Sequence, residues 1–200
     1  MKKLLITGFE PFGNFEVNPA WLAVEKLPER IGDFELCKLM IPTTFGQAAQ
    51  ILMDKAKEFS PDVILSVGVA GGRNAVTPER IAVNIRDARI ADNAGFQPQG
   101  DPVDPEGPAA YFATVPVREM VSAINAAGIT AALSYSAGAF VCNDLLYALL
   151  HRYDGTAIRA GFIHVPFLPQ QAKEGVPSMP LEQIIAALQA AISGLDDQNR

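Results

Sequence analysis

The sequence predicts an α/β fold, a three-layer α/β/α sandwich with a mostly parallel (mixed) central sheet. Apolar runs rich in Leu, Ile and Val alternate with segments whose apolar residues recur at helical spacing. The run DVILSVG (62–68) is almost wholly apolar, which is typical of a strand covered on both faces. The chain has 200 residues, 49% of them hydrophobic, so we expect one domain spanning 1–200 with a large core.

The first half of the chain begins with a strand and a capped helix. Asn18 and Pro19 form a helix start, because Asn caps well and Pro is tolerated at the first helical position. Thr43 or Thr44 is expected to cap a second helix in the same way. The predicted elements are a strand at 4–7, a helix at 19–27, a strand at 34–41, a helix ending at Phe59 and a strand at 62–68.

The second half is interrupted by a long loop. Residues 92–108 contain four Pro, three Gly and no periodicity, and a loop of this length in a compact domain is often functional. The predicted elements are a strand at 81–85, a helix at 116–127, a strand at 129–135, a helix from Gly138 or Phe140 to Arg152, a strand at 157–165 and a helix over 181–192.

Charge and cysteine content exclude several classes of function. The net charge is −6, which argues against nucleic acid as a partner, and no stretch of about 18 apolar residues predicts a membrane span. The apolar run after Lys2-Lys3 breaks at Gly8 and is too short for a signal peptide, so we expect the cytoplasm. Two Cys and two His without close spacing predict no metal site.

The two cysteines differ in their predicted surroundings. Cys37 lies within a predicted strand, where a buried, inert thiol is expected. Cys142 falls in the first turn of a helix that follows a strand and a turn of small residues, and a helix N-terminus lowers the pKa of a thiol. Position alone leaves two readings of Cys142 open, a nucleophile or a core side chain facing inward.

A cysteine nucleophile needs a base, and the chain has two histidines. His151 is nine residues beyond Cys142 on the same predicted helix, about 13.5 Å along its axis and on the opposite face. We interpret it as a cation at the helix C-terminus. His164 ends a predicted strand, at the edge of the sheet where Cys142 is expected, and so is the candidate base unless it is a hydrogen-bonded core residue.

An acid that orients the base cannot be chosen by spacing, because the chain has 22 Asp and Glu. Glu79 is a candidate because it follows the glycine-rich turn after a buried strand, although an exposed loop acid would look the same. That turn, GVAGG (68–72), lacks the Lys-Ser/Thr of a P-loop and does not match the dinucleotide fingerprint. Its glycines are equally suited to a close approach of the backbone to a small ligand.

Several segments together resemble pyroglutamyl peptidase type I, also called pyrrolidone carboxyl peptidase. The resemblance covers nearly the whole chain, with a looser C-terminal helix, and the Cys and His segments are specific in combination. Val69 and Ala91 depart from residues frequent in the family, which puts only pocket detail in doubt. The segments are TGFEPFG (7–13), AGGR (70–73), PERIAVNIRDARIADN (78–93), GPAAYF (107–112), SAGAFVCN (136–143) and GFIHVPFLP (161–169).

The resemblance implies a phosphorylase/hydrolase-like form of the α/β fold and a thiol protease of the omega peptidase type. It would hydrolyse the N-terminal pyroglutamyl (5-oxoprolyl) residue of peptides through a thioester, without metal or organic cofactor, as a homotetramer. Matching residues imply Cys142 as nucleophile, His164 as base, Glu79 as orienting acid and Arg89 near the acyl oxygen. The implied substrate-binding residues are Phe9, Phe12, Asn18, Phe140 and Val141.

Two other classes of function remain as alternatives. A nucleoside phosphorylase-like enzyme would have a similar sheet and could use the glycine-rich turns to hold phosphate, but it would need no nucleophilic cysteine. A non-catalytic binding or redox-sensing module would show thiol oxidation with no turnover of an amide. Replacing Cys142 and assaying each activity separates the three.

Overall fold

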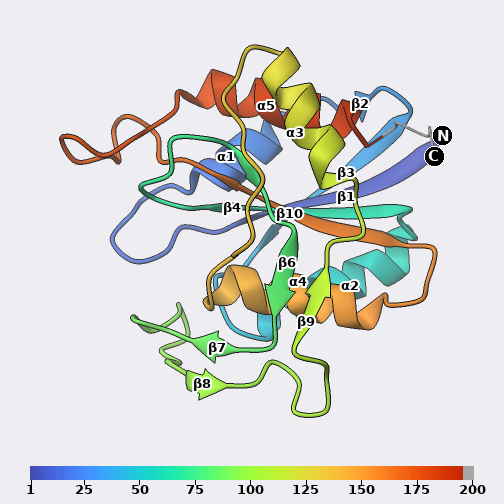
Figure 1. Ribbon diagram of the computed structural model, residues 1–200, viewed down its shortest axis with the longest axis vertical. Coiled ribbons are helices and arrows are strands. Elements are labelled where there is room, and N and C mark those ends of the chain that lie inside the picture. Colours follow the sequence, from blue (N-terminus) through green and yellow to red (C-terminus); the bar gives the residue numbers. More distant parts are fainter. Residues whose placement is uncertain (196–200) are drawn as a thin grey trace.

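Six strands form the central sheet in the computed structural model, which describes residues 1–195 (Figure 1). The middle strands β3, β1, β4 and β10 are parallel neighbours, and the short edge strands β2 and β5 are antiparallel to theirs. The mostly parallel mixed sheet is therefore confirmed. In sheet order the strands are β2 (Arg30–Ile31), β3 (Phe34–Ile41), β1 (Lys2–Phe9), β4 (Val63–Val69), β10 (Arg159–Val165) and β5 (Thr77–Pro78).

Helices cover both faces of this sheet, which makes the three layers (Figure 1). Alternate residues of β1 enter different cores: Leu4 and Ile6 pack toward one set of helices and Leu5 toward the other. Asn18 caps the first helix by accepting a hydrogen bond from the Ala20 amide, as predicted. One face carries α1 (Pro19–Glu25), α3 (Val117–Ala126) and α5 (Leu181–Ser193), and the other α2 (Gln47–Phe59) and α4 (Val141–Arg152).

Two small antiparallel sheets lie in the lower half of Figure 1, one at the level of α4 and the other below it. In one, β6 (Ile81–Val83) pairs with β9 (Ala110–Phe112). In the other, β7 (Arg86–Asp87) pairs with β8 (Gln99–Asp101). The expectation that 92–108 is entirely loop was therefore wrong at β8, whose short Gly-containing sequence gives no strand pattern.

The strand expected at 129–135 does not form. This segment makes only isolated bridges, Val76 with Ala131 and Glu79 with Ser134. Its apolar residues alternate because Ile129, Ala131 and Leu133 pack against the core, while the segment as a whole never joins the sheet. The segment nevertheless hydrogen-bonds along residues 76–80 beside β5, for example from the Ala132 amide to the Val76 carbonyl and from the Ser134 amide to the Pro78 carbonyl, so it is an irregular extended segment and not a regular strand.

A threonine does not cap the second helix, which was also expected. Gly46 occupies the cap position of α2 at φ 69°, and no side chain caps the helix. The Thr43 hydroxyl instead donates a hydrogen bond to the carbonyl oxygen of Glu10, in the loop after β1. Thr43 therefore ties together two loops at the carboxyl end of the sheet.

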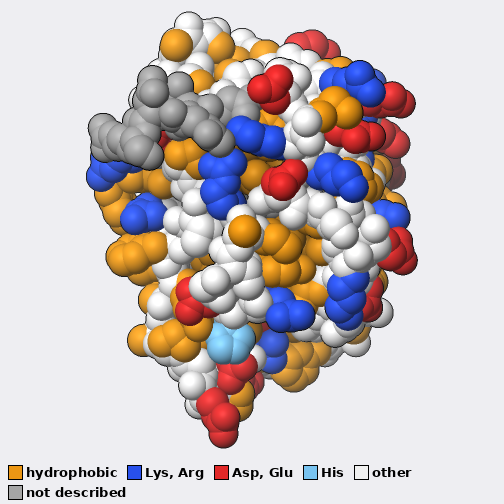
Figure 2. Space-filling view, turned by 90° about the vertical axis from the view of Figure 1, so that its right-hand side faces the viewer, with side chains coloured by type: hydrophobic (Ala, Val, Ile, Leu, Met, Phe, Trp, Pro, Cys, Tyr) orange, Lys and Arg blue, Asp and Glu red, His pale blue; other side chains and the backbone are white. Residues whose placement is uncertain are grey.

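The described residues contain no helix long and apolar enough to cross a membrane. On the face that Figure 2 shows, Lys and Arg side chains are interspersed with Asp and Glu. Residues 196–200, the end of the predicted domain 1–200, lie outside the described range, so the full span of that domain stays a prediction.

Candidate active site

The carboxyl ends of β4 and β10 bring His164 beside Gly68. The two residues are partners across the parallel pair, so their Cβ directions point to the same face of the sheet, about 4.8 Å apart. That face is the one covered by α4, because Phe162, two residues before His164, packs in the core beneath this helix. The His164 side chain is almost completely buried, and its ring lies 4.8 Å from the Phe162 ring.

Cys142 reaches this position from the first turn of α4. A Cβ atom built on Gly68 would lie only 2.9 Å from the Cys142 sulfur and 2.8 Å from the Phe162 ring. The sulfur therefore occupies space that exists because residue 68 has no side chain. Strand register and helix position together place the Cys142 sulfur and the His164 ring at neighbouring points of one face. No regular strand directly precedes Cys142, so the carboxyl end of the sheet at this site is formed by β4 and β10.

Glu79 is buried between these elements and holds the imidazole. Its Oε1 atom lies 2.7 Å from Nδ1 of His164, and its backbone N–H donates to the carbonyl of Phe162. With Nδ1 engaged by a carboxylate, Nε2 is the nitrogen available to a neighbouring thiol. The reading of Glu79 as an exposed loop acid is excluded, because none of its side chain is exposed.

Arg73 also binds Glu79, and sequence reasoning missed it. One terminal nitrogen, Nη1, donates to Oε1 of Glu79 at 2.6 Å and to the Thr77 hydroxyl at 2.5 Å. The other, Nη2, donates to the carbonyl of Ser136 at 2.9 Å. The available signal was that Arg73 is a cation six residues before a candidate buried acid, in the segment AGGR.

Burial and neighbouring charges decide the protonation of the site. Burial raises the pKa of Cys142 to about 12, the charge of Glu79 acts in the same direction, and Arg73 opposes both. Burial lowers the pKa of His164 below its ordinary 6.5, and the charge of Arg73 lowers it further. The hydrogen bond to Glu79 and the charge of Glu79 raise it, but they do not cancel the effect of burial. Neutral pH therefore leaves a thiol and a neutral imidazole. The pKa of Cys142 is thus raised, and not lowered as its place in the first turn of a helix predicted.

Glu79 remains ionised in spite of its burial. Burial raises the pKa of its carboxyl group, but the hydrogen bond of His164 acts against burial, as does the charge of His164 whenever the imidazole is protonated. Hydrogen bonds of Ser134 and Arg73 lower the pKa further, so that it lies below its ordinary value of 4.5. A carboxylate, a neutral imidazole and a thiol form the arrangement in which the imidazole can accept the thiol proton.

A small aromatic pocket of about 40 Å³ opens beside the Cys142 sulfur. Four of the five predicted substrate-binding residues line it. Val141 does not, because its side chain is buried in the core beneath α4. The lining residues are Phe9, Phe12, Asn18, Thr43, Val69, Phe140 and Cys142.

The polar residues of this pocket are used to hold its walls. The Asn18 side chain caps α1 through Oδ1 and donates through Nδ2 to the carbonyl of Glu10. The Glu10 carboxylate accepts hydrogen bonds from the Thr43 amide and from the Asn93 side chain. Three loops are thereby joined around a cavity whose remaining wall is mainly aromatic, which suits a neutral ring better than a charged group.

Arg89 lies apart from this network. Its side chain is exposed just after β7, it does not line the pocket, and among residues 1–195 it has no hydrogen-bond or ion-pair partner. Its placement near the acyl oxygen stays a prediction. The arginine that the structure places at the buried acid is Arg73.

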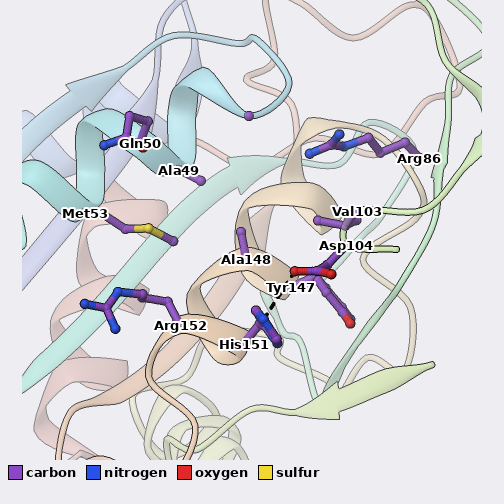
Figure 3. A pocket seen from close by; sticks show the side chains of 11 residues that line it. Ala49, Gln50, Met53, Arg86, Val103, Asp104, Tyr147, Ala148, His151 and Arg152 are labelled. Atoms are coloured by element: carbon purple, nitrogen blue, oxygen red, sulfur yellow. Dashed lines mark ion pairs between the residues drawn. The ribbon is translucent and has the colours of Figure 1, made fainter. Parts of the chain in front are cut away.

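The remaining Cys and His lie elsewhere. Cys37 is half-buried on β3 and packs against the core beneath α2 and α4. His151, in the last turn of α4 as expected, contacts the Tyr111 hydroxyl at 2.8 Å and Asp104 at 3.3 Å. Figure 3 shows His151 at a separate cavity of about 240 Å³ between α2 and α4, to which Cys142 and His164 contribute nothing. No cluster that could hold a metal ion occurs within the described part of the chain.

Known proteins resemble this chain over nearly its full length. The pyroglutamyl peptidase family model matches residues 2–198. A pyrrolidone-carboxylate peptidase of Levilactobacillus brevis is 49% identical over 96% of this chain and 97% of its own, and one of Escherichia fergusonii is 48% identical over 96% and 92%.

Solved structures agree with the sequence comparison. The crystal structure of Bacillus amyloliquefaciens pyroglutamyl peptidase I superimposes with a TM-score of 0.94 at 42% identity, covering 98% of this chain and 97% of that one. Pyrrolidone carboxyl peptidase of Thermococcus litoralis gives 0.93 at 39% identity, covering 98% and 94%. Together with the match of the family model, these likenesses show that the chain belongs to the pyroglutamyl peptidase family of hydrolases.

Proposed function

We propose that the protein is a cysteine-type omega peptidase that hydrolyses the N-terminal pyroglutamyl residue from peptides and proteins, with Cys142, His164 and Glu79 as its triad. The observation that carries the proposal is the buried hydrogen bond of 2.7 Å between Glu79 and His164, in a site where the Cys142 sulfur borders an aromatic pocket. Family membership supports the reaction type, and the geometry supports the assignment of roles.

The pocket supports recognition of a neutral lactam. The pyroglutamyl ring carries no charge, and rings of Phe9, Phe12 and Phe140 provide apolar walls beside the sulfur. An ordinary N-terminal ammonium would lose its hydration among these walls without gaining a counter-ion, which costs several kcal/mol on the order of a buried unpaired charge. Selectivity for the cyclised N-terminus follows from this penalty.

Reaction begins with transfer of the Cys142 thiol proton to Nε2 of His164 as the sulfur attacks the pyroglutamyl carbonyl carbon. The oxyanion is held by backbone N–H groups at the start of α4, which have no acceptor within the helix. The imidazolium then protonates the leaving amine, the C–N bond breaks, and a thioester remains. Water, deprotonated by His164, attacks the thioester; pyroglutamate leaves and the proton returns to the sulfur.

Release of a fluorogenic amine from a pyroglutamyl amide tests this proposal. Cys142→Ala and His164→Ala are expected to lose activity by at least about a thousandfold, because each removes a member of a unit that acts together. Cys37→Ser is the matched control and should keep most of the activity, since Cys37 lies on β3 away from the pocket. An active Cys142→Ala enzyme, or an inactive Cys37→Ser enzyme, would remove Cys142 as the nucleophile.

Location and assembly are part of the same proposal. A cytoplasmic homotetramer is what the resemblance implies, and peptides with N-terminal pyroglutamate are the proposed partners. Light scattering coupled to size-exclusion chromatography measures the mass in solution, and a monomeric mass at all concentrations would contradict the tetramer.

A further inference from the structure

We propose that Arg73 is a positioning residue for this reaction, whose guanidinium binds the carboxylate oxygen that orients His164 and thereby sets the acid limit of activity. The inference rests on the proposed triad but concerns a residue outside it. Arg73 does not line the aromatic pocket, so it acts on the reaction through the groups that it binds, above all Glu79 and the carbonyl of Ser136.

The hydrogen bonds of Arg73 connect the base side of the site to the nucleophile side. Nη1 binds Glu79 and Thr77, and it lies 3.4 Å from the Ser134 hydroxyl. Nη2 binds the carbonyl of Ser136, four residues before the cap of α4, the helix that carries Cys142. The Thr77 hydroxyl in turn donates to the backbone carbonyl of His164. One guanidinium thus braces the segments that present all three members of the triad.

The charge of Glu79 depends on the same contact. The carboxylate is fully buried, and its second oxygen, Oε2, has no hydrogen-bond partner among the described residues. Both strong donors, Arg73 and His164, therefore meet on Oε1. A neutral His164 supplies no positive charge, so Arg73 is the cation that balances this buried anion while the enzyme is ready to react.

The direction of the pH effect follows from the groups that face one another here. They are Arg73 after the glycine-rich turn, Glu79 directly after β5, His164 on β10 and Cys142 on α4. With Arg73 present, ionised Glu79 and neutral His164 give a cluster of zero net charge. Without Arg73 the cluster is negative and binds a proton more readily, on either His164 or Glu79. Protonation of His164 removes the base, and protonation of Glu79 removes the carboxylate that orients it, so activity should be lost at a higher pH than in the parent enzyme.

The decisive experiment is the pH profile of kcat/KM for Arg73→Gln and Arg73→Lys. The acid limb is the part of this profile in which kcat/KM falls as the pH decreases. In Arg73→Gln its midpoint should lie about one pH unit or more higher, which is the size of effect that a neighbouring charge produces. The loss of activity in this variant should appear mainly in kcat, because the pocket is unchanged. Arg73→Lys keeps the charge and should hold the acid limb within about half a unit, with a lower kcat because a lysine cannot bind Glu79 and Ser136 as a fork.

Arg80→Gln is the matched control. Arg80 is also an arginine next to the site in sequence, but it donates to the carbonyl of Ala113 and stacks over Phe112 instead of binding Glu79. Its acid limb should coincide with that of the parent enzyme. Equal shifts in Arg80→Gln and Arg73→Gln would reduce the effect to overall charge and overturn the proposal, as would an unshifted limb in Arg73→Gln.

A measurement that needs no turnover separates this inference from the peptidase assignment. The chain has only two histidines, so ¹⁵N imidazole titration by NMR can follow His164 in the Cys142→Ala background. Adding Arg73→Gln should raise the pH at which the Glu79–His164 pair takes up a proton. If Arg73→Gln fails to fold, Arg73→Lys provides the test, and a shift above about one unit there would contradict the charge argument.

Discussion

At the scale of single residues, the site combines a protonated nucleophile with a neutral base. Burial raises the pKa of Cys142 to about 12, so the residue is a thiol in the free protein. Burial also lowers the pKa of His164, so the imidazole is neutral at neutral pH. Proton transfer must therefore accompany attack on the substrate, in contrast to an enzyme that rests as a thiolate–imidazolium pair. The charge of Glu79 favours the thiol form of Cys142, and the charge of Arg73 favours the neutral form of His164.

Alkylation of Cys142 tests the resting thiol. Because the reactive species is the thiolate, the rate with iodoacetamide should rise about tenfold per pH unit between about pH 6 and 9, without a plateau. Mass spectrometry of the labelled peptides gives the rates at Cys142 and Cys37 separately. An alkylation rate at Cys142 that is already independent of pH at acid pH would reveal a preformed thiolate and contradict the resting thiol.

At the scale of elements, the contact between α4 and β4 decides where the sulfur lies. Gly68→Ala would place a methyl group 2.9 Å from the Cys142 sulfur and 2.8 Å from the Phe162 ring. We expect a loss of stability of about 1–3 kcal/mol from overpacking and a disproportionate fall in kcat as the sulfur is displaced. Urea unfolding and steady-state kinetics measure the two effects.

Gly161→Ala is the matched control for this substitution. It overpacks the other face of the sheet, where the new methyl group would collide with the side chain of Val115. It should therefore cost stability in the same way while leaving kcat of the folded enzyme much less affected. Equal losses of kcat in both variants would show that general strain, and not the position of the sulfur, limits the reaction.

Sequence patterns predicted the elements best where a local rule decides the structure. Asn18-Pro19 started a helix and 34–41 formed a strand because capping and hydrophobic runs act locally. The segment 129–135 was predicted as a strand from its alternation, but it pairs with residues 76–80 only irregularly, through isolated bridges, and the regularity of such pairing depends on residues distant in the chain. Cys142 and Glu79 needed the family resemblance, and Arg73 was missed because its partners lie from four to 63 residues away in the chain.

At the scale of the whole molecule, the sheet order could not be read from the sequence, yet it is what joins the site. Residues 68 and 164 are far apart in the chain and become partners only because β4 and β10 are neighbours. This arrangement buries two ionisable side chains, His164 and Glu79, in the interior of the protein. The stability of the protein should therefore depend on pH through these two groups.

Stability should fall in two stages on acidification. The folded pKa of His164 is lowered from 6.5, so below that pH the unfolded chain binds the proton more readily, and the free energy of unfolding decreases until pH reaches the folded pKa. The folded pKa of Glu79 is lowered from 4.5, so its contribution is present above 4.5 and is lost as pH falls through the folded value. Urea unfolding between about pH 2 and 8 measures both stages. His164→Gln should abolish the first stage, and an unchanged slope just below pH 6.5 in this variant would show that His164 is not the group responsible.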